Sequence, residues 1–136
     1  MKLITRDTDY ALRALCYIAK KEKKVVSISE LVEQLRMPRP FLRKALQILN
    51  KKGILHSYKG SGGGFVLSRG TQDISLLGLI EIFQGPLSLN ECSFKRKECP
   101  EQRKCPLRRK IGLLEKYIIS ELRNISVASL LAKARA

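Results

Sequence analysis

The stretch that decides the fold is PRPFLRKALQILNKKGILHSYKGSGGGFVL, residues 38–67. Its two prolines forbid a continuous helix from the preceding segment but suit the first turn of a new one. Apolar residues then recur at helical spacing as far as Lys51, and Gly53 follows as a C-terminal cap. Two strand-like runs, 54–58 and 65–67, flank a basic, glycine-rich tip. This order predicts a DNA-reading helix followed by the hairpin of a wing.

The predicted reading helix has an apolar face and a basic face. Between Met37 and Lys59 the chain carries six basic residues and no acidic one, as phosphate binding requires. Arg39, Arg43 and Lys44 lie on the face opposite the apolar one. We expect the apolar face to comprise Phe41, Leu42, Ala45, Leu46 and Leu49.

Two amphipathic helices precede this stretch. The first covers residues 3–19, and its apolar positions place Cys16 on the buried stripe as a small core residue. The second begins at Ser27 or Ser29, since either serine can cap it. Helix, helix, turn, helix and hairpin in about 70 residues form the pattern of a winged helix-turn-helix.

A fourth helix and a long fifth one follow the wing. Ser75 is a cap for the fourth, which ends near Gly85. The long helix has a narrow apolar seam that can pack on its own core or on a second copy, and we favour a homodimer, because operator-binding winged helices pair their half-site readers by two-fold symmetry. Ser126 begins a last short helix. The seam comprises Leu107, Ile111, Leu114, Ile118 and Leu122.

These segments predict a mainly α protein with a small β-hairpin wing. We expect one compact domain made of three regions: a winged helix-turn-helix DNA-binding region at 1–84, a cysteine-bearing loop at 85–106, and a dimerisation helix with a C-terminal tail at 107–136. Neither a signal peptide nor a run of 18 uncharged apolar residues is present, so we expect a cytoplasmic protein without membrane contact.

The composition favours a polyanionic partner. Twenty-seven Lys and Arg against twelve Asp and Glu give a formal charge of +15. A solvated basic surface, or an adaptor for an acidic protein, would have the same charge, but duplex DNA also explains the local basic face. The chain shows no paired carboxylates and no nucleophile with a base, and its glycines lead into a strand rather than a phosphate-binding helix, so an enzyme is not expected.

Three cysteines, Cys92, Cys99 and Cys105, share one predicted loop with the spacing C-x6-C-x5-C. Disulfides suit secreted, core-poor proteins, so reduced thiols with a metal or redox role are expected here. Neighbouring basic residues favour thiolates, and thus both metal binding and oxidation. The spacing fits neither common zinc sites nor ferredoxins, and a fourth ligand is missing; His56 lies in a wing strand, where a polar surface role is expected.

Three stretches together resemble the Rrf2 family of bacterial regulators. They are Thr8-Asp9-Tyr10-Ala11-Leu12-Arg13, Lys59-Gly60-Ser61-Gly62-Gly63-Gly64-Phe65 and the three-cysteine loop. The resemblance implies a homodimeric winged-helix repressor or activator that binds palindromic double-stranded DNA. It also implies that DNA affinity depends on an iron–sulfur cluster, 4Fe–4S or 2Fe–2S, which an apo form lacks.

The resemblance also implies the site residues. Cys92, Cys99 and Cys105 match the family's cysteine ligands. IscR-like members have a histidine where this chain has Arg108, whereas NsrR-like members have an aspartate in the first helix that the partner subunit supplies, and Asp9 matches it. A carboxylate stabilised by the helix dipole is the alternative role for Asp9. The DNA-binding residues implied by the family and by side-chain chemistry are Pro38, Arg39, Pro40, Arg43, Lys44, Lys51, Lys52 and Lys59.

Sequence analysis therefore predicts a redox-, nitric-oxide- or iron-sensing transcription regulator. The alternative keeps DNA binding but replaces the cluster with cysteine oxidation or structural zinc.

Overall fold

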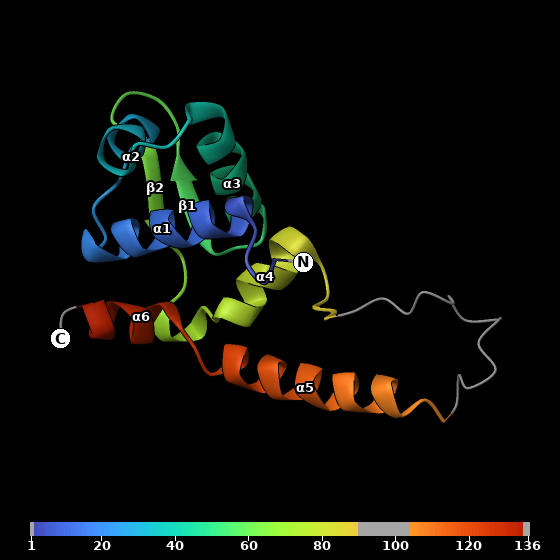
Figure 1. Cartoon of the computed structure of the whole chain (residues 1–136). Coiled ribbons are helices and arrows are strands. Elements are labelled where there is room, and N and C mark those ends of the chain that lie inside the picture. Colours follow the sequence, from blue (N-terminus) through green and yellow to red (C-terminus); the bar gives the residue numbers. More distant parts are fainter. Residues whose placement is uncertain (1, 90–103, 135–136) are drawn as a thin grey trace.

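A computed structural model describes residues 2–89 and 104–134. Within these ranges the chain forms α-helices and one antiparallel hairpin (Figure 1). The elements are α1 (Arg6–Lys20), α2 (Ile28–Leu35), α3 (Arg39–Lys51), β1 (Leu55–Tyr58), β2 (Gly64–Leu67), the 3-10 turn η1 (Thr71–Asp73), α4 (Leu76–Gln84), α5 (Pro106–Arg123) and α6 (Val127–Ala134).

Helices α1 to α3 and the hairpin form a winged helix-turn-helix, as predicted. In the hairpin, Leu55 pairs with Leu67 and Tyr58 pairs with Gly64. Val26, which precedes α2, forms an isolated bridge with Phe65 and so ties the wing to the helices. The apolar faces of α1, α2, α3 and β1 meet in one core. This is why apolar residues recur at helical spacing in the three helices and why burial alternates along the strand β1. Its largest fully buried side chains include Leu15, Leu31, Leu42, Leu46, Leu49 and Leu55.

Local side-chain chemistry sets the helix ends. Ser27, not Ser29, caps α2, because its Oγ accepts a hydrogen bond from the backbone N–H of Glu30 at 3.1 Å. Ser75 accepts from Gly78 at 3.0 Å in the same way. After α3, Gly53 has a φ of +76°, the left-handed conformation expected just past a helix end.

Two sequence expectations about the first and third helices are wrong. Helix α1 begins at Arg6 rather than Leu3. Phe41 does not face the core with its neighbours but is 42% exposed, and the guanidinium of Arg6 lies 4.7 Å from the centre of its ring. A position at the edge of an apolar stripe is ambiguous from spacing alone, and here a cation–π contact with α1 holds the ring at the surface.

A second, smaller cluster joins α4 and α5. Leu76, Leu77, Ile80 and Leu122 are buried in it, with Ile118 packed against them. Two backbone hydrogen bonds join the residues around the start of α4 to those around the start of α6. Leu76 N–H donates to the carbonyl oxygen of Ile125 at 2.8 Å, and Val127 N–H donates to that of Ile74 at 2.9 Å. The starts of α4 and α6 are thereby fastened together.

The predicted seam of α5 is only partly covered. Its C-terminal end packs on the second cluster, but Leu107 is 66% and Leu114 54% exposed; Tyr117, which is not part of the predicted seam, is also 66% exposed. In Figure 1 the first turns of α5 extend beyond the winged-helix body. None of the helices in the described ranges combines the length and the apolar character needed to cross a lipid bilayer.

Candidate functional site

The start of α3 presents the predicted DNA-binding residues to solvent. Pro38 is the N-cap in an extended conformation, and Arg39 and Pro40 open the helix. Because Leu42, Ala45, Leu46 and Leu49 are buried, the helix is anchored from behind. All of the predicted contacts are exposed: Pro38, Arg39, Pro40, Arg43, Lys44, Lys51, Lys52 and Lys59.

The two arginines at the start of α3 have different surroundings. Nη2 of Arg39 donates a hydrogen bond to Oγ of Ser29 on α2, at 2.9 Å. Arg43 lies one turn further on and is exposed. Ser29 was expected only as a possible cap, and its contact with Arg39 depends on the turn between α2 and α3.

The wing has a tight tip that carries Lys59. A Cβ at Gly63 would lie 2.3 Å from the carbonyl oxygen of Tyr58, so only glycine fits there. On β1, His56 is exposed, as predicted, and its ring meets that of Tyr58 edge to face with centroids 4.8 Å apart. Arg69, which sequence analysis did not single out, donates from Nη2 to the carbonyl oxygen of Lys52 at 3.3 Å and so joins the end of the wing to the end of α3.

Of the three predicted cysteine ligands, Cys92 and Cys99 lie outside the described residues. Cys105 is the N-cap of α5 and is partly exposed. The first turn of α5 contains no acidic residue, and Arg108 and Arg109 lie in it. The positive end of the helix dipole and these two cations favour an anion at this position.

Cys16 has a different environment. It packs against the main core, as predicted. Burial raises the pKa of its thiol, and the opposing effect of Lys20 is smaller. Cys16 is therefore a poor thiolate donor and does not belong to the candidate cysteine site.

Asp9 lies in the first turn of α1 and pairs with Arg13. Its Oδ2 accepts a hydrogen bond from Nε of Arg13 at 3.0 Å, and both side chains are well exposed. In Figure 1 the first turn of α1 lies on the winged-helix body, apart from the start of α5 that follows Cys105. Within residues 2–89 and 104–134, no three His, Cys, Asp or Glu side chains come together in a way that could hold a metal ion.

The described donors nevertheless fit an anionic iron–sulfur group in chemical character. Cys105 supplies a partly exposed sulfur beside two arginines and a helix N-terminus. Asp9 supplies an exposed carboxylate, which is suited to a ligand position only if another subunit brings the cysteines to it.

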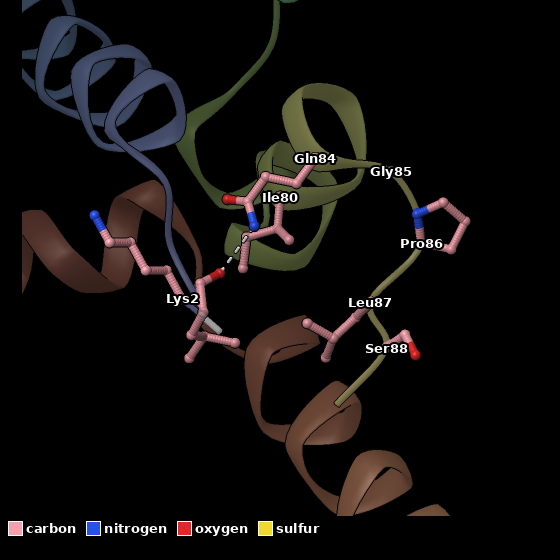
Figure 2. Close-up of a pocket in the computed structure, with 8 residues that line it drawn as sticks. Lys2, Ile80, Gln84, Gly85, Pro86, Leu87 and Ser88 are labelled. Carbon is pink, nitrogen blue, oxygen red and sulfur yellow. Dashed lines mark hydrogen bonds between the residues drawn. The ribbon is translucent and has the colours of Figure 1, made fainter. Parts of the chain in front are cut away.

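Sequence analysis missed Gln84, the last residue of α4. Its side chain bonds to Thr5, Thr8 and the carbonyl oxygen of Leu3, and Thr8 is completely buried. A shallow cleft of about 140 Å³ lies beside it (Figure 2). This volume is below that of ordinary small-molecule sites. The cleft is lined by Lys2, Leu3, Ile80, Gln84, Gly85, Pro86, Leu87 and Ser88.

Known sequences resemble this chain along most of its length. Residues 4–133 match the Rrf2 family, described as iron-dependent transcriptional regulators. A protein of Aquifex aeolicus described as an HTH-type transcriptional regulator is 35% identical over 92 residues. That match covers 68% of this chain and 64% of the Aquifex protein, so the chain spans slightly less than two thirds of that relative's length.

Solved structures share the fold. The global cysteine regulator CymR of B. subtilis superposes with a TM-score of 0.81 at 20% identity, covering 98% of each chain. IscR of T. potens superposes with a TM-score of 0.75 at 22% identity, covering 98% of this chain and 88% of that one. The family match over residues 4–133 shows that this chain belongs to the Rrf2 family, a family of transcriptional regulators and not of enzymes, and the shared winged-helix fold agrees with it.

Proposed function

We propose that this chain is a cytoplasmic, homodimeric repressor that binds a palindromic duplex operator and whose DNA affinity is set by an iron–sulfur cluster. The observation that carries DNA binding is the exposed basic face of α3, anchored by a buried apolar face. In this proposal Arg39 or Arg43 meets base edges in the major groove, while Lys44, Lys51, Lys52 and Lys59 hold phosphates or enter the minor groove.

The exposed seam of α5 supports a dimer. Leu107, Leu114 and Tyr117 are large apolar side chains that are more than half exposed on α5, and a second copy packed against them would remove them from water. A second copy of α5 packed along this surface would relate two reading helices by a two-fold axis, which matches a palindromic operator.

Cys92, Cys99 and Cys105 are the proposed cysteine ligands, with Asp9 of the partner subunit as the fourth. When bound, the cluster would supply a redox- and nitric-oxide-reactive centre. Arg108 and Arg109 offset its negative charge at the start of α5. The match to a family described as iron-dependent supports this assignment.

The test is anaerobic purification followed by an absorption spectrum with iron and sulfide assays. We expect a brown protein that loses its colour in Cys92→Ala, Cys99→Ala and Cys105→Ala and retains it in Cys16→Ala. Loss of the spectrum, or a change in it, in Asp9→Ala would assign the fourth ligand; an unchanged spectrum would give Asp9 only its role at the helix N-terminus.

A wild-type protein without a cluster would support the alternative function. A colourless wild-type protein without iron, even after reconstitution with ferrous iron and sulfide, would overturn the cluster. The basic face of α3 would then serve a regulator that uses thiol oxidation or structural zinc.

A further inference from the structure

A single side chain, that of Gln84, joins the end of α4 to the first turn of α1. Its Oε1 accepts hydrogen bonds from the backbone N–H of Thr5 at 2.9 Å and from the hydroxyl of Thr8 at 2.6 Å. Its Nε2 donates to the carbonyl oxygen of Leu3 at 3.1 Å, the dashed line in Figure 2. Thr5 and Gln84 are 79 positions apart in the sequence, so this connection is entirely tertiary.

The first turn of α1 depends on this side chain. Thr5 is the N-cap of α1 but makes no capping hydrogen bond with its own side chain. Thr8 is completely buried, and Gln84 provides its shortest hydrogen bond. Gln84 thus accepts from the backbone N–H of the N-cap residue, as the glutamate or glutamine of a capping box does from within a helix.

This first turn carries Asp9, a residue of the proposed site, and Arg6, which contacts the reading helix. Asp9 follows Thr8 directly, and its backbone N–H donates to the carbonyl oxygen of Thr5 at 3.0 Å. Arg6 stacks on Phe41 in the first turn of α3. A movement of the first turn of α1 would therefore reach the reading helix through a direct contact.

At its other end Gln84 is connected to α5. The chain leaves α4 through Gly85, and Leu87 packs against the second cluster. The backbone N–H of Leu89 then donates to a carboxylate oxygen of Glu115, on α5, at 3.2 Å. The segment 85–89 is thus fixed to the helix that begins after Cys105.

From these contacts we infer that Gln84 is a positioning residue that couples the cysteine end of α5 to the reading helix through the first turn of α1. The inference rests on the proposed function, because it requires that a group bound at Cys105 changes DNA affinity. Coupling between two sites of one protein typically changes affinity about 5- to 150-fold.

The experiment measures a ratio of affinities. The operator is selected from random duplexes with the wild-type protein, and its Kd is measured anaerobically for the cluster-loaded and the cluster-free protein. Gln84→Leu is expected to bring the ratio of the two Kd values to within about twofold of one. Gln84→Glu keeps the acceptor for Thr5 and Thr8 and should retain most of the ratio. Gln72→Leu, a change at an exposed glutamine in η1, is the matched control and should leave it unchanged.

A second readout needs no cluster. In the cluster-free protein, deuterium exchange at the amides of Thr5 and Asp9, the hydrogen-bonded amides of this turn, should rise in Gln84→Leu and stay constant in Gln72→Leu. If Gln84 were only a stabilising residue, its loss would lower the Tm but leave the Kd ratio unchanged, and that result would overturn the inference.

The two proposals fail differently. A wild-type ratio of one overturns the proposed regulation, and the coupling role falls with it. A large wild-type ratio that survives in Gln84→Leu overturns only the coupling role. If Gln84→Leu does not fold, Thr8→Val removes the 2.6 Å hydrogen bond with little change of shape. Thr8→Val is then expected to bring the ratio of the two Kd values close to one.

Discussion

At the scale of single residues, Arg39 and Arg43 differ although both lie on the exposed face of α3. Arg39 is tied to Ser29 at 2.9 Å, which fixes the direction of its guanidinium before DNA arrives. Arg43 lies one turn along the same face, and we propose that it contacts base edges.

Arg43→Ala is expected to reduce discrimination between operator and random DNA by about 1–3 kcal/mol, because a base-contacting arginine is lost. Lys51→Ala is the matched control: it should weaken binding to both DNAs equally and reduce the slope of log K against log salt by about one. Titrations at several salt concentrations measure both effects. Equal weakening of the two DNAs by Arg43→Ala would show that Arg43 contacts phosphate.

The thiols of Cys16 and Cys105 should react at different rates. The raised pKa of Cys16 lowers its thiolate fraction at neutral pH, and the thiolate is the reactive species. In reduced, cluster-free protein, iodoacetamide should therefore modify Cys105 well before Cys16, and the rate for Cys16 should rise only at more alkaline pH. Peptide mass spectrometry measures the order of modification. Equal rates in the folded protein would contradict the burial of Cys16, whereas equal rates in urea are expected.

At the scale of elements, the hairpin and the capped ends of α2, α3 and α4 could be predicted because they depend on neighbours in the sequence, whereas the start of α1 could not. Proline, serine and glycine set the limits of α2, α3 and α4 through local hydrogen bonds and backbone angles. The surface position of Phe41 and the contacts of Gln84 could not be predicted, since each depends on a partner that folding brings from elsewhere. The cysteine ligands, Asp9 and the individual DNA contacts remain predictions.

Ser27→Ala should lower the free energy of unfolding by about 1 kcal/mol, because it removes the cap of α2. Ser29→Ala, two residues away on an exposed position, should change it by less than about 0.5 kcal/mol. Urea denaturation of both variants provides the comparison. A larger loss in the Ser29 variant would mean that α2 begins two residues later than in this structure.

Gly64→Ala should destabilise the wing more than Gly60→Ala. A Cβ at Gly64 would lie 2.3 Å from the carbonyl oxygen of Val26, so the bridge between Val26 and Phe65 must open. At Gly60, where φ is +90°, the added Cβ meets open space, and only the backbone penalty of about 1–2 kcal/mol remains. Thermal unfolding ranks the two variants, and equal losses would argue against close packing of the wing on the residue before α2.

At the scale of the whole molecule, burial along α5 falls from its C-terminal end, which packs on the chain's own core, to the exposed part that we propose as the dimer surface. The C-terminal end of α5 contributes Leu122 to the second cluster, while Leu114 and Tyr117 are exposed. Spacing predicted a continuous seam, but only the packing of α4 against α5 shows where the chain's own core ends.

The double variant Leu114→Glu with Tyr117→Glu is expected to convert a dimer into a monomer, because four like charges would face one another across the two-fold axis. Lys116→Glu, also exposed on α5, is the control for the change in charge and should remain dimeric. Light scattering after gel filtration gives the number of chains, and helical circular dichroism checks the fold. A wild-type monomer, or a dimer that survives the double variant, would contradict the assignment of α5.

Two hydrogen bonds fasten the start of α4 to the start of α6. The chain therefore leaves the winged-helix body at Ser75 and returns to the same place at Ser126. For such an excursion the entropy of closure grows only logarithmically with length, by about 0.6 kcal/mol per doubling. The link between α4 and α5 can therefore change in length at little cost in closure entropy, provided that α4 and the C-terminal end of α5 keep their packing on the rest of the chain. The same DNA-binding fold can in this way be kept while the residues between α4 and α5 vary in number and chemistry.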